Sequence, residues 1–484
     1  MNDLVNTING FVWSPVLVYL CLGAGLYFSI RSRFVQLRGL PEMFRLLLRG
    51  RSSSMGVSPF QALSMALSNR VGTGNIAGVA TAITFGGPGA VFWMWMVAFF
   101  GASTAFVEST LAQIYKERDH DGRYRGGPAY YIEKALGQRW YAYVFAVATM
   151  IGTGIFLCGI QANTIVASVG NAWPVPAWVT AGGVVGLLAL VIFGGVRRIA
   201  RFAAIVVPFM ALAYIGVALV LMVLNAAEIP AMFALIVRSA FNMEAAYGAI
   251  AGLSVEWGVK RGVLSNEAGM GSGAHHAGAA EVDHPAQQGF VQAFSIYIDT
   301  LLVCTATAFM LLLTGAYNIV GPDGTSIVEN LPGVETGPAF AQAAIESLLP
   351  GLGARFVAVA LFIFAFTTSV ACYYVSETSL AYLTRDKPRA WLMQGWRALV
   401  LVGVGYCALN PAPLAWSLAD LAVGVMSWLN IVAILIVHKP AFLALRDYDA
   451  KRHSGQTIDF DPESLGIAKA DLWAKKFRER AVDG

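Results

Sequence analysis

The residues best suited to chemistry in this chain lie in the segment 64–85, where two apolar halves flank the polar run Asn69-Arg-Val-Gly-Thr-Gly-Asn75. Gly72 and Gly74 each disfavour a helix by about 1 kcal/mol relative to alanine. The asparagine and threonine side chains compete with helical backbone hydrogen bonds. Inside a membrane, freed backbone groups are tolerated only where protein buries them or where they line a polar cavity. The pattern predicts a transmembrane helix broken at a binding site, against the alternative of a glycine kink that only permits close helix packing.

The two half-helices at such a break suit opposite charges. The second half begins near Asn75, and its free N–H groups and positive dipole end suit a carboxylate. The first half ends near 69–71 with free carbonyl groups, which suit a small cation or an ammonium group. A zwitterion and a sodium ion would satisfy both ends. The predicted substrate-binding residues at the break are Thr73, Gly74, Asn75 and Ile76.

The composition indicates a protein of the lipid bilayer. Of 484 residues, 57% are hydrophobic and 13% are charged, against about 25% charged in soluble domains. The net charge of +4 is small and dispersed, which argues against a nucleic-acid partner. Neither the five cysteines nor the adjacent His275 and His276 have the spacing of a metal site. We predict no cofactor, no metal other than sodium and, in the absence of a catalytic constellation, no enzymatic activity.

Apolar runs predict about eleven transmembrane helices. Their predicted ranges are 12–30, 58–85, 89–115, 140–170, 177–193, 199–224, 239–259, 286–314, 353–383, 390–409 and 414–437. Basic clusters follow the odd-numbered spans, including Lys260 and Arg261 after the seventh, and basic connections are typically cytoplasmic. We therefore predict a multi-pass plasma (inner) membrane protein whose N-terminus lies outside and whose C-terminus is cytoplasmic. The acidic loop 317–350 then lies outside, with a short helix at 339–349.

Without its first span, the chain divides into five plus five helices of opposite polarity. We predict an N-terminal helix and basic connection in 1–57, a first repeat in 58–225, a second in 226–438 and a cytoplasmic tail in 439–484. A second glycine-interrupted segment, 244–252, lies in the span that opens the second repeat. Interruptions at matching positions of two halves indicate an inverted-repeat transporter, so Tyr247 and Gly248 are further substrate-binding candidates.

Ionisable residues inside spans are costly and mark functional sites. Arg70 has two open interpretations, a contact with the substrate carboxylate or a structural ion pair with Glu108, Glu244 or Glu377. Asp299 and Glu256 are candidates for proton or cation binding. The segment 267–284, which contains Glu267 and three histidines, is interpreted as a polar cytoplasmic connection.

Several motifs together resemble the alanine or glycine:cation symporter family over nearly the whole chain. They are Ser68-Asn-Arg-Val-Gly-Thr-Gly-Asn-Ile-Ala-Gly78, Phe85-Gly-Gly-Pro-Gly89, Ile160-Gln-Ala-Asn-Thr-Ile165, Ser265-Asn-Glu-Ala-Gly-Met-Gly-Ser272, Asp283-His-Pro-Ala-Gln-Gln-Gly289, Ile298-Asp-Thr-Leu-Leu-Val-Cys-Thr-Ala-Thr307 and Phe364-Ala-Phe-Thr-Thr368. The resemblance implies an all-α polytopic fold with a five-plus-five inverted-repeat core of the sodium-coupled amino-acid transporter type, whose first and sixth core helices are broken.

The resemblance also implies roles for individual residues. In related sodium symporters, carbonyls matching Ser68 and Val71 bind sodium together with hydroxyls at the positions of Thr367 and Thr368, and an asparagine matching Asn75 helps to hold a second ion. The family motif implies that Gln161 lines the substrate site, with interhelical hydrogen bonding as the alternative. Cys372 stands where many family members carry a tryptophan, which implies a larger pocket here.

The predicted function is secondary active symport, by alternating access, of sodium and a small neutral amino acid such as alanine or glycine. The alternatives are a proton-coupled amino-acid symporter or exchanger, and a symporter for a larger neutral amino acid such as serine or glutamine. A channel, which would need a continuous polar pore, is the competing class outside transporters.

Overall fold

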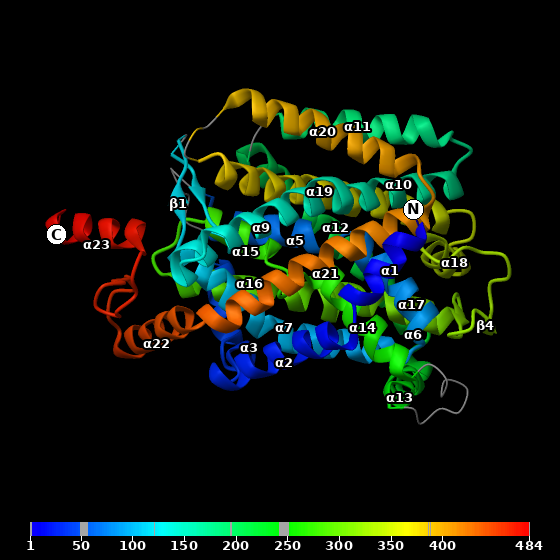
Figure 1. Ribbon diagram of the computed structural model, residues 1–484. Helices are drawn as coiled ribbons and strands as arrows, with labels where there is room; N and C mark the ends of the chain where they lie inside the picture. Colours follow the sequence, from blue (N-terminus) through cyan, green and yellow to red (C-terminus); the bar gives the residue numbers. More distant parts are fainter. Residues whose placement is uncertain are drawn as a thin grey trace.

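Helices make up nearly all of the fold, and their long axes run across the view in Figure 1. The computed structural model describes residues 2–48, 57–120, 122–193, 196–241, 251–385, 387 and 389–483. The hairpin β1–β2 and helices α22 and α23 lie at the left end of Figure 1, whereas α13, α18 and strand β4 lie at the right end. The chain termini lie at opposite ends of the molecule.

The elements of the first part of the chain are α1 (Asn2–Val12), α2 (Pro15–Arg31), α3 (Val35–Arg38), α4 (Leu40–Leu48), α5 (Pro59–Arg70), η1 (Gly74–Gly78), α6 (Val79–Gly86), α7 (Gly89–Ile114), β1 (Glu117–Arg118), β2 (Tyr124–Arg125), α8 (Pro128–Tyr131), η2 (Ile132–Leu136), α9 (Arg139–Ile151), η3 (Gly152–Leu157), α10 (Cys158–Ala172), α11 (Ala177–Ile192) and α12 (Val196–Leu224). The second part comprises η4 (Ala226–Glu228), α13 (Ile229–Ala240), α14 (Ala251–Asn266), α15 (Ser272–Ala279), α16 (Pro285–Ile296), η6 (Tyr297–Cys304), α17 (Thr305–Thr314), β3 (Asn318–Val320), β4 (Ser326–Glu329), α18 (Pro338–Leu348), α19 (Gly353–Leu383), α20 (Ala390–Leu409), α21 (Ala412–Val437), α22 (Lys439–Ser454) and α23 (Asp471–Asp483).

Seven helices in the described part of the chain are long and apolar enough to cross a membrane by themselves. The bent pair 211–224 and 226–240, which turns by 82°, would make an eighth. Most predicted spans therefore have a matching helix, and the spans 353–383 and 390–409 match α19 and α20 to the residue. The total of eleven crossings and the inverted repeat remain predictions.

The first predicted break is confirmed. Helix α5 ends at Arg70, Val71 is extended with φ −78° and ψ 92°, and the π-helical turn η1 begins at Gly74. At its start, Ser58 caps α5 in a reciprocal capping box with Gln61, which satisfies backbone N–H groups that would otherwise lack partners.

The structure shows an interruption after α14 that the sequence did not predict. The segment 242–250, with Tyr247 and Gly248, is outside the described residues. The predicted span 239–259 is wrong in its boundaries, because α14 continues to Asn266 and the following interruption is 267–271. Gly269 (φ +83°) and Gly271 (φ +86°) adopt the left-handed conformation that glycine allows. The short helix α15 then follows, so the expected polar connection is a broken helix.

Lys260 and Arg261 do not form a basic cluster at the end of a span. Both lie within α14 and form ion pairs with Asp420 of α21, at 3.0 and 2.7 Å. Burial requires these charges to be paired, and the acidic partner is supplied by a helix distant in sequence. The sequence interpretation of these residues as a span terminus is therefore wrong.

The predicted outer loop 317–350 contains more structure than expected. Its strands β3 and β4 form an antiparallel hairpin. The predicted short helix is confirmed as α18, whose Phe340 and Ile345 are buried. This loop lies at the end of the molecule opposite to the β1–β2 hairpin (Figure 1).

Candidate functional site

The break after α5 is held open by side chains that replace the missing helical hydrogen bonds. The N–H of Gly72 donates to Asn75 Oδ1 (2.8 Å), and the N–H of Thr73 donates to Gln161 Oε1 (2.9 Å). The Thr73 hydroxyl also donates to Gln161 Oε1, at 2.7 Å. Gln161, on α10, therefore occupies the N-terminal end of the second half-helix with a partly negative oxygen.

Three carbonyl oxygens converge on the hydroxyl of Thr368 in α19. The hydroxyl lies 2.8 Å from Ser68 O, 3.1 Å from Val71 O and 3.0 Å from Phe364 O. A threonine hydroxyl has only one proton to donate, so it cannot satisfy all three oxygens at once. A small cation, which prefers several oxygen ligands, fits such a cluster.

Three of the four predicted cation ligands lie in this cluster, and the fourth, Thr367, does not. Ser68, Val71 and Thr368 share the cluster, whereas the Thr367 hydroxyl donates to Phe364 O of its own helix at 2.9 Å. Phe364 O is a ligand candidate that the sequence reasoning missed. The signal was available, because a carbonyl four residues before a helical threonine lies within reach of its hydroxyl.

A small cavity adjoins the break and the cation cluster. Its volume is about 10 Å³, which is room for about one water molecule. Side chains therefore have to move before an amino acid can enter. The lining residues are Asn69, Arg70, Thr73, Gly74, Leu157, Ile160, Gln161, Leu264, Glu267, Thr368, Cys372 and Trp416.

Four of the predicted substrate-binding residues line this cavity, namely Thr73, Gly74, Gln161 and Cys372. Cys372 is 1% exposed. Trp416, on α21, lines the same cavity, so an indole group is present although Cys372 replaces the one expected on α19. Asn75 and Ile76 are buried and are absent from the lining.

Glu267 is the principal residue that the sequence reasoning misplaced. It lies at the second break with φ +58° and lines the cavity. Its Oε2 accepts hydrogen bonds from Asn69 Nδ2 (2.5 Å) and Ser272 Oγ (2.7 Å). A buried carboxylate beside the cavity is suited to an ammonium group. The acidic residue inside the glycine-rich run 265–272 was the available signal.

Arg70 forms no ion pair with a carboxylate among the described residues, so the expected pairs with Glu108 and Glu377 are wrong, and Glu244 lies outside the described residues. Its Nε donates to Asn266 O at 2.6 Å, and its Nη1 donates to Gln292 Oε1 at 3.2 Å and to Ser295 Oγ. The Nη2 atom is buried without a hydrogen-bond partner in the described chain. Arg70 is also a lining residue of the cavity, and its unpartnered Nη2 lies against Gly273 of α15.

A second polar cluster surrounds Asp299 of η6. Asn75 Nδ2 donates to Asp299 Oδ1 at 2.6 Å, and Ser265 Oγ donates to Oδ2 at 2.9 Å. Thr300 Oγ1 donates to Oδ2 at 2.7 Å. Asp299 is fully buried, and no basic side chain in the described ranges forms an ion pair with it. Asn75 therefore faces this cluster, which joins both breaks to η6.

Asn163, which belongs to the same motif as Gln161, and the proton- or cation-binding candidate Glu256 are absent from the cavity lining. Asn163 Nδ2 donates to Cys407 O and Asn410 O, at 3.0 and 2.8 Å, which matches interhelical hydrogen bonding. Glu256 is partly exposed within α14.

The sequence matches the sodium:alanine symporter family over residues 1–462. YrbD of Bacillus subtilis (strain 168) is 55% identical over 477 residues, which cover 99% of this chain and 98% of the relative. A sodium/proton-dependent alanine carrier protein of Bacillus sp. (strain PS3) is 47% identical over 437 residues, covering 90% of this chain and 98% of the relative.

A solved structure supports the fold assignment. A manganese transporter of Eremococcus coleocola superimposes with a TM-score of 0.50 over 87% of this chain and 88% of that chain, at 13% sequence identity. At this identity the likeness concerns the fold alone, which is that of a multi-pass membrane transporter.

Proposed function

The chain belongs to the sodium:alanine symporter family, a family of membrane transporters, and from this premise we propose that it couples inward sodium flux to the uptake of alanine, glycine or a similar small neutral amino acid. The observation that carries this proposal is the convergence of Ser68, Val71 and Phe364 carbonyls on Thr368 Oγ1. A sodium ion in this cluster would join α5 to α19 beside the cavity. Ion binding would thereby stabilise the arrangement that receives the substrate.

We propose that the substrate carboxylate displaces Gln161 Oε1 from the Thr73 N–H and hydroxyl. Both groups already donate to a single oxygen at 2.9 and 2.7 Å, so they are oriented for a carboxylate. Arg70 Nη2, buried and without a partner among the described residues, would supply a second anchor. Glu267, on the opposite break, would receive the ammonium group.

The chemistry predicts the substrate class. A neutral amino acid presents one carboxylate and one ammonium group, matching Arg70 and Glu267, and the small cavity favours a short side chain. A substrate as large as glutamine would require Trp416 or the side chains around Cys372 to move. Glycine, alanine, serine and glutamine in one competition series would rank these alternatives.

Uptake of radiolabelled alanine into proteoliposomes tests the proposed coupling. We expect uptake driven by an inward sodium gradient and none without an ion gradient. Glu267→Gln removes the charge while keeping the shape, and should weaken alanine binding more than sodium binding. Uptake that does not depend on sodium would contradict the assignment of the Thr368 cluster as a sodium site.

Proton coupling is a second candidate because Asp299 is buried and forms no ion pair among the described residues. Its ligands Asn75, Ser265 and Thr300 would also suit a second cation. Alanine uptake driven by a proton gradient in the absence of sodium distinguishes proton coupling from a second cation site. Proton coupling would be supported if this uptake occurs in the wild type and is lost in Asp299→Asn.

The proposed orientation has the N-terminus outside and the C-terminus in the cytoplasm of a cell whose plasma (inner) membrane contains the protein. The location of the termini at opposite ends supports an odd number of crossings (Figure 1). Cysteine labelling at position 10 and at position 455, from each side of intact cells, would test it.

A further inference from the structure

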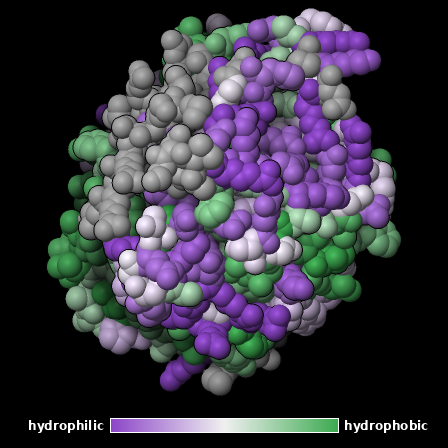
Figure 2. All heavy atoms as spheres, turned by 90° about the vertical axis from the view of Figure 1, so that its left-hand side faces the viewer, coloured by the Kyte–Doolittle hydropathy of each residue, from purple (hydrophilic) through white to green (hydrophobic). Residues whose placement is uncertain are grey.

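A second cavity lies between the β1–β2 hairpin and the facing ends of α19 and α20. Its volume is about 720 Å³, within the roughly 300–1,000 Å³ of small-ligand sites. Figure 2 views this end of the molecule and shows hydrophilic side chains gathered there around a hollow. The lining residues are Glu117, Arg118, Asp119, His120, Arg123, Arg125, Tyr130, Glu133, Lys134, Glu377, Ala381, Thr384, Arg385, Arg389, Ala390, Met393 and Arg397.

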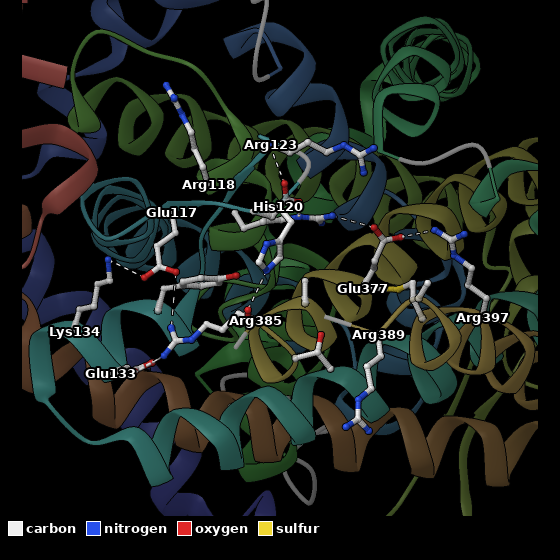
Figure 3. Close-up of a pocket in the computed structure, with 17 residues that line it drawn as sticks. Glu117, Arg118, His120, Arg123, Glu133, Lys134, Glu377, Arg385, Arg389 and Arg397 are labelled. Atoms are coloured by element: carbon white, nitrogen blue, oxygen red, sulfur yellow. Dashed lines mark hydrogen bonds and ion pairs between the residues drawn. The ribbon is translucent and has the colours of Figure 1, made fainter. Parts of the chain in front are cut away.

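Basic side chains outnumber acidic ones in this lining. Seven arginine and lysine side chains stand against four carboxylates, an excess of three positive charges before His120 is counted. Figure 3 shows the labelled basic side chains placed around the cavity, with Arg118 and Arg123 on one side, Lys134 on another, and Arg389 and Arg397 opposite. The guanidinium groups of Arg118 and Arg389 point outward from the middle of this cluster. Such an arrangement concentrates positive potential within a recess.

The four carboxylates are already neutralised. Glu377 pairs with Arg125 and Arg397 at 3.1 and 3.6 Å, and Asp119 also pairs with Arg125, at 3.0 Å. Glu133 pairs with Arg385 at 2.5 Å. Glu117 pairs with Lys134 at 2.9 Å. None of these four carboxylates pairs with Arg118 or Arg389.

Two of the remaining cations have no carboxylate partner in the described chain. Arg118 Nη2 contacts only a neutral group, the Tyr124 hydroxyl at 3.4 Å, and its guanidinium lies over the Tyr124 ring. The Arg389 side chain forms none of the hydrogen bonds or ion pairs found among the described residues. Both are exposed, and they come from opposite sides of the cavity, the hairpin and the start of α20 (Figure 3).

Exposed aromatic residues place the cavity at the level of a membrane interface. Trp391, next to the lining residue Ala390, is 65% exposed, and Trp140, at the start of α9, is 67% exposed. Tryptophan gathers at the membrane–water boundary. Beyond Trp391, α20 exposes Leu399 and Val402, as a lipid-facing helix would. Basic pockets between transmembrane helices at this depth suit phosphate headgroups.

We propose that this cavity binds a phosphate-bearing anion, with Arg118 and Arg389 contributing the charge that the described carboxylates leave uncompensated. The interfacial position favours the headgroup of an anionic phospholipid over a free phosphate. The bound anion would join the hairpin to α19, the helix that also carries Thr368, and to α20. The site is independent of the coupling ion and substrate proposed above.

The experiment measures binding to the purified full-length protein in neutral detergent. The probes are short-chain phosphatidylglycerol, short-chain phosphatidylcholine and inorganic phosphate, and the readout is intrinsic tryptophan fluorescence together with the unfolding temperature. The test variant is Arg118→Gln/Arg389→Gln. The control variant, Arg446→Gln/Lys475→Gln, removes the same charge from exposed positions of α22 and α23 that do not line the cavity.

We expect saturable binding of phosphatidylglycerol but not of phosphatidylcholine. Each basic side chain near an anionic headgroup is worth about 1 kcal/mol, so the test variant should bind about 30-fold more weakly and the control should bind like the wild type. The same pattern with inorganic phosphate, and not with phosphatidylglycerol, would identify a soluble phosphate as the ligand. Binding of neither anion, or equal weakening in the test and control variants, would overturn the proposal.

Discussion

At the scale of single residues, the Thr368 hydroxyl is the point where α5 and α19 meet. It contacts two carbonyls at the end of α5 and one carbonyl of its own helix. Thr367, its neighbour, contacts only its own helix. The two threonines are therefore expected to differ in function, although the resemblance gives them the same role.

Thr368→Val keeps the side-chain shape and removes the oxygen. Losing an interaction with a charged group costs about 1.5–3 kcal/mol, so the sodium concentration for half-maximal alanine uptake should rise about tenfold or more. Thr367→Val should have a smaller effect. Thr84→Val is the matched control, because the buried Thr84 hydroxyl bonds only to Ala80 O within α6. An unchanged sodium requirement in Thr368→Val would remove this residue from the site.

Gly72 is the glycine at the break with the least space. A methyl group there would overlap Thr368 Oγ1 and lie 2.9 Å from Gln161 Oε1, whereas at Gly74 the nearest atom is Ser265 Cα at 3.2 Å. Gly72→Ala should therefore disturb cation and substrate sites together. Overpacking of this kind costs about 1–3 kcal/mol.

We expect Gly72→Ala to impair sodium and alanine binding at least tenfold, and Gly74→Ala to have a weaker effect, with both proteins still folded. Binding of each ligand can be followed by isothermal calorimetry. Gly182→Ala on α11, where a methyl group meets open space, is the control. If Gly74→Ala is the more damaging change, the substrate lies closer to η1 than proposed here.

The sequence predicted the break at 69–75, but it did not predict the surroundings of Glu267 and Arg70 in the candidate site. The glycine and asparagine pattern at 69–75 indicates a break because local propensity alone disfavours a helix there. Glu267 and Arg70 could not be assigned in this way, since their roles depend on which helices pack together. Arg70 is stabilised by neutral oxygens of α14 and α16, including Asn266 O and Gln292 Oε1, and spacing along the chain does not encode such contacts.

At the scale of elements, α14 shows why the interruption at 267–271 was not predicted. Two consecutive basic residues after an apolar run usually mark the end of a span. In this helix Lys260 and Arg261 stay inside, because both form ion pairs with Asp420 of α21 and both lie over the Trp257 ring. Asp420 lies 159 residues from Arg261 in the sequence. The charge pattern around Arg261 therefore does not reveal this partner.

Asp420→Asn should destabilise the protein strongly. It leaves two buried cations without their partner, and breaking a buried ion pair costs about 3–5 kcal/mol. We expect a clearly lower unfolding temperature in detergent. Asp449→Asn, which removes a more exposed partner of Arg38, should change it little, as surface pairs contribute at most about 1 kcal/mol. Similar unfolding temperatures for the two variants would contradict the assigned role of Asp420.

At the scale of the whole molecule, the C-terminal tail is part of the folded structure. Helix α22 contributes Tyr448, whose hydroxyl donates to Glu42 at 2.5 Å, and Asp447, whose Oδ2 lies 3.1 Å from His284 Nε2. The sequence shows no apolar period in this tail, so its docking could not be predicted. The tail is docked by contacts of single large side chains. The family match ends at residue 462, before α23 begins.

Trp473 is the residue through which α23 attaches. It is 2% exposed, its Nε1 donates to Gln113 O at 2.7 Å, and its ring packs edge-on against Phe460. Lys116 Nζ lies 5.2 Å from the Trp473 ring. A helix of 13 residues is marginal in water by itself, so α23 depends on this anchor for its structure.

Trp473→Ala should release α23 without unfolding the membrane part of the molecule. Truncating a buried tryptophan costs about 3–5 kcal/mol, more than a short isolated helix can recover, so the segment 461–483 should become sensitive to trypsin while the unfolding temperature of the remainder stays nearly constant. Lys475→Ala, at a side chain that is 73% exposed, should leave the tail as resistant as in the wild type. Alanine uptake measured on the same samples would show whether the docked tail affects transport, because Gln113 lies in the last turn of α7 and Lys116 follows it, and α7 packs along α14 and α16. A protease pattern in Trp473→Ala identical to that of the wild type would mean that other contacts, such as that between Lys134 and Asp471, are sufficient to keep the tail in place.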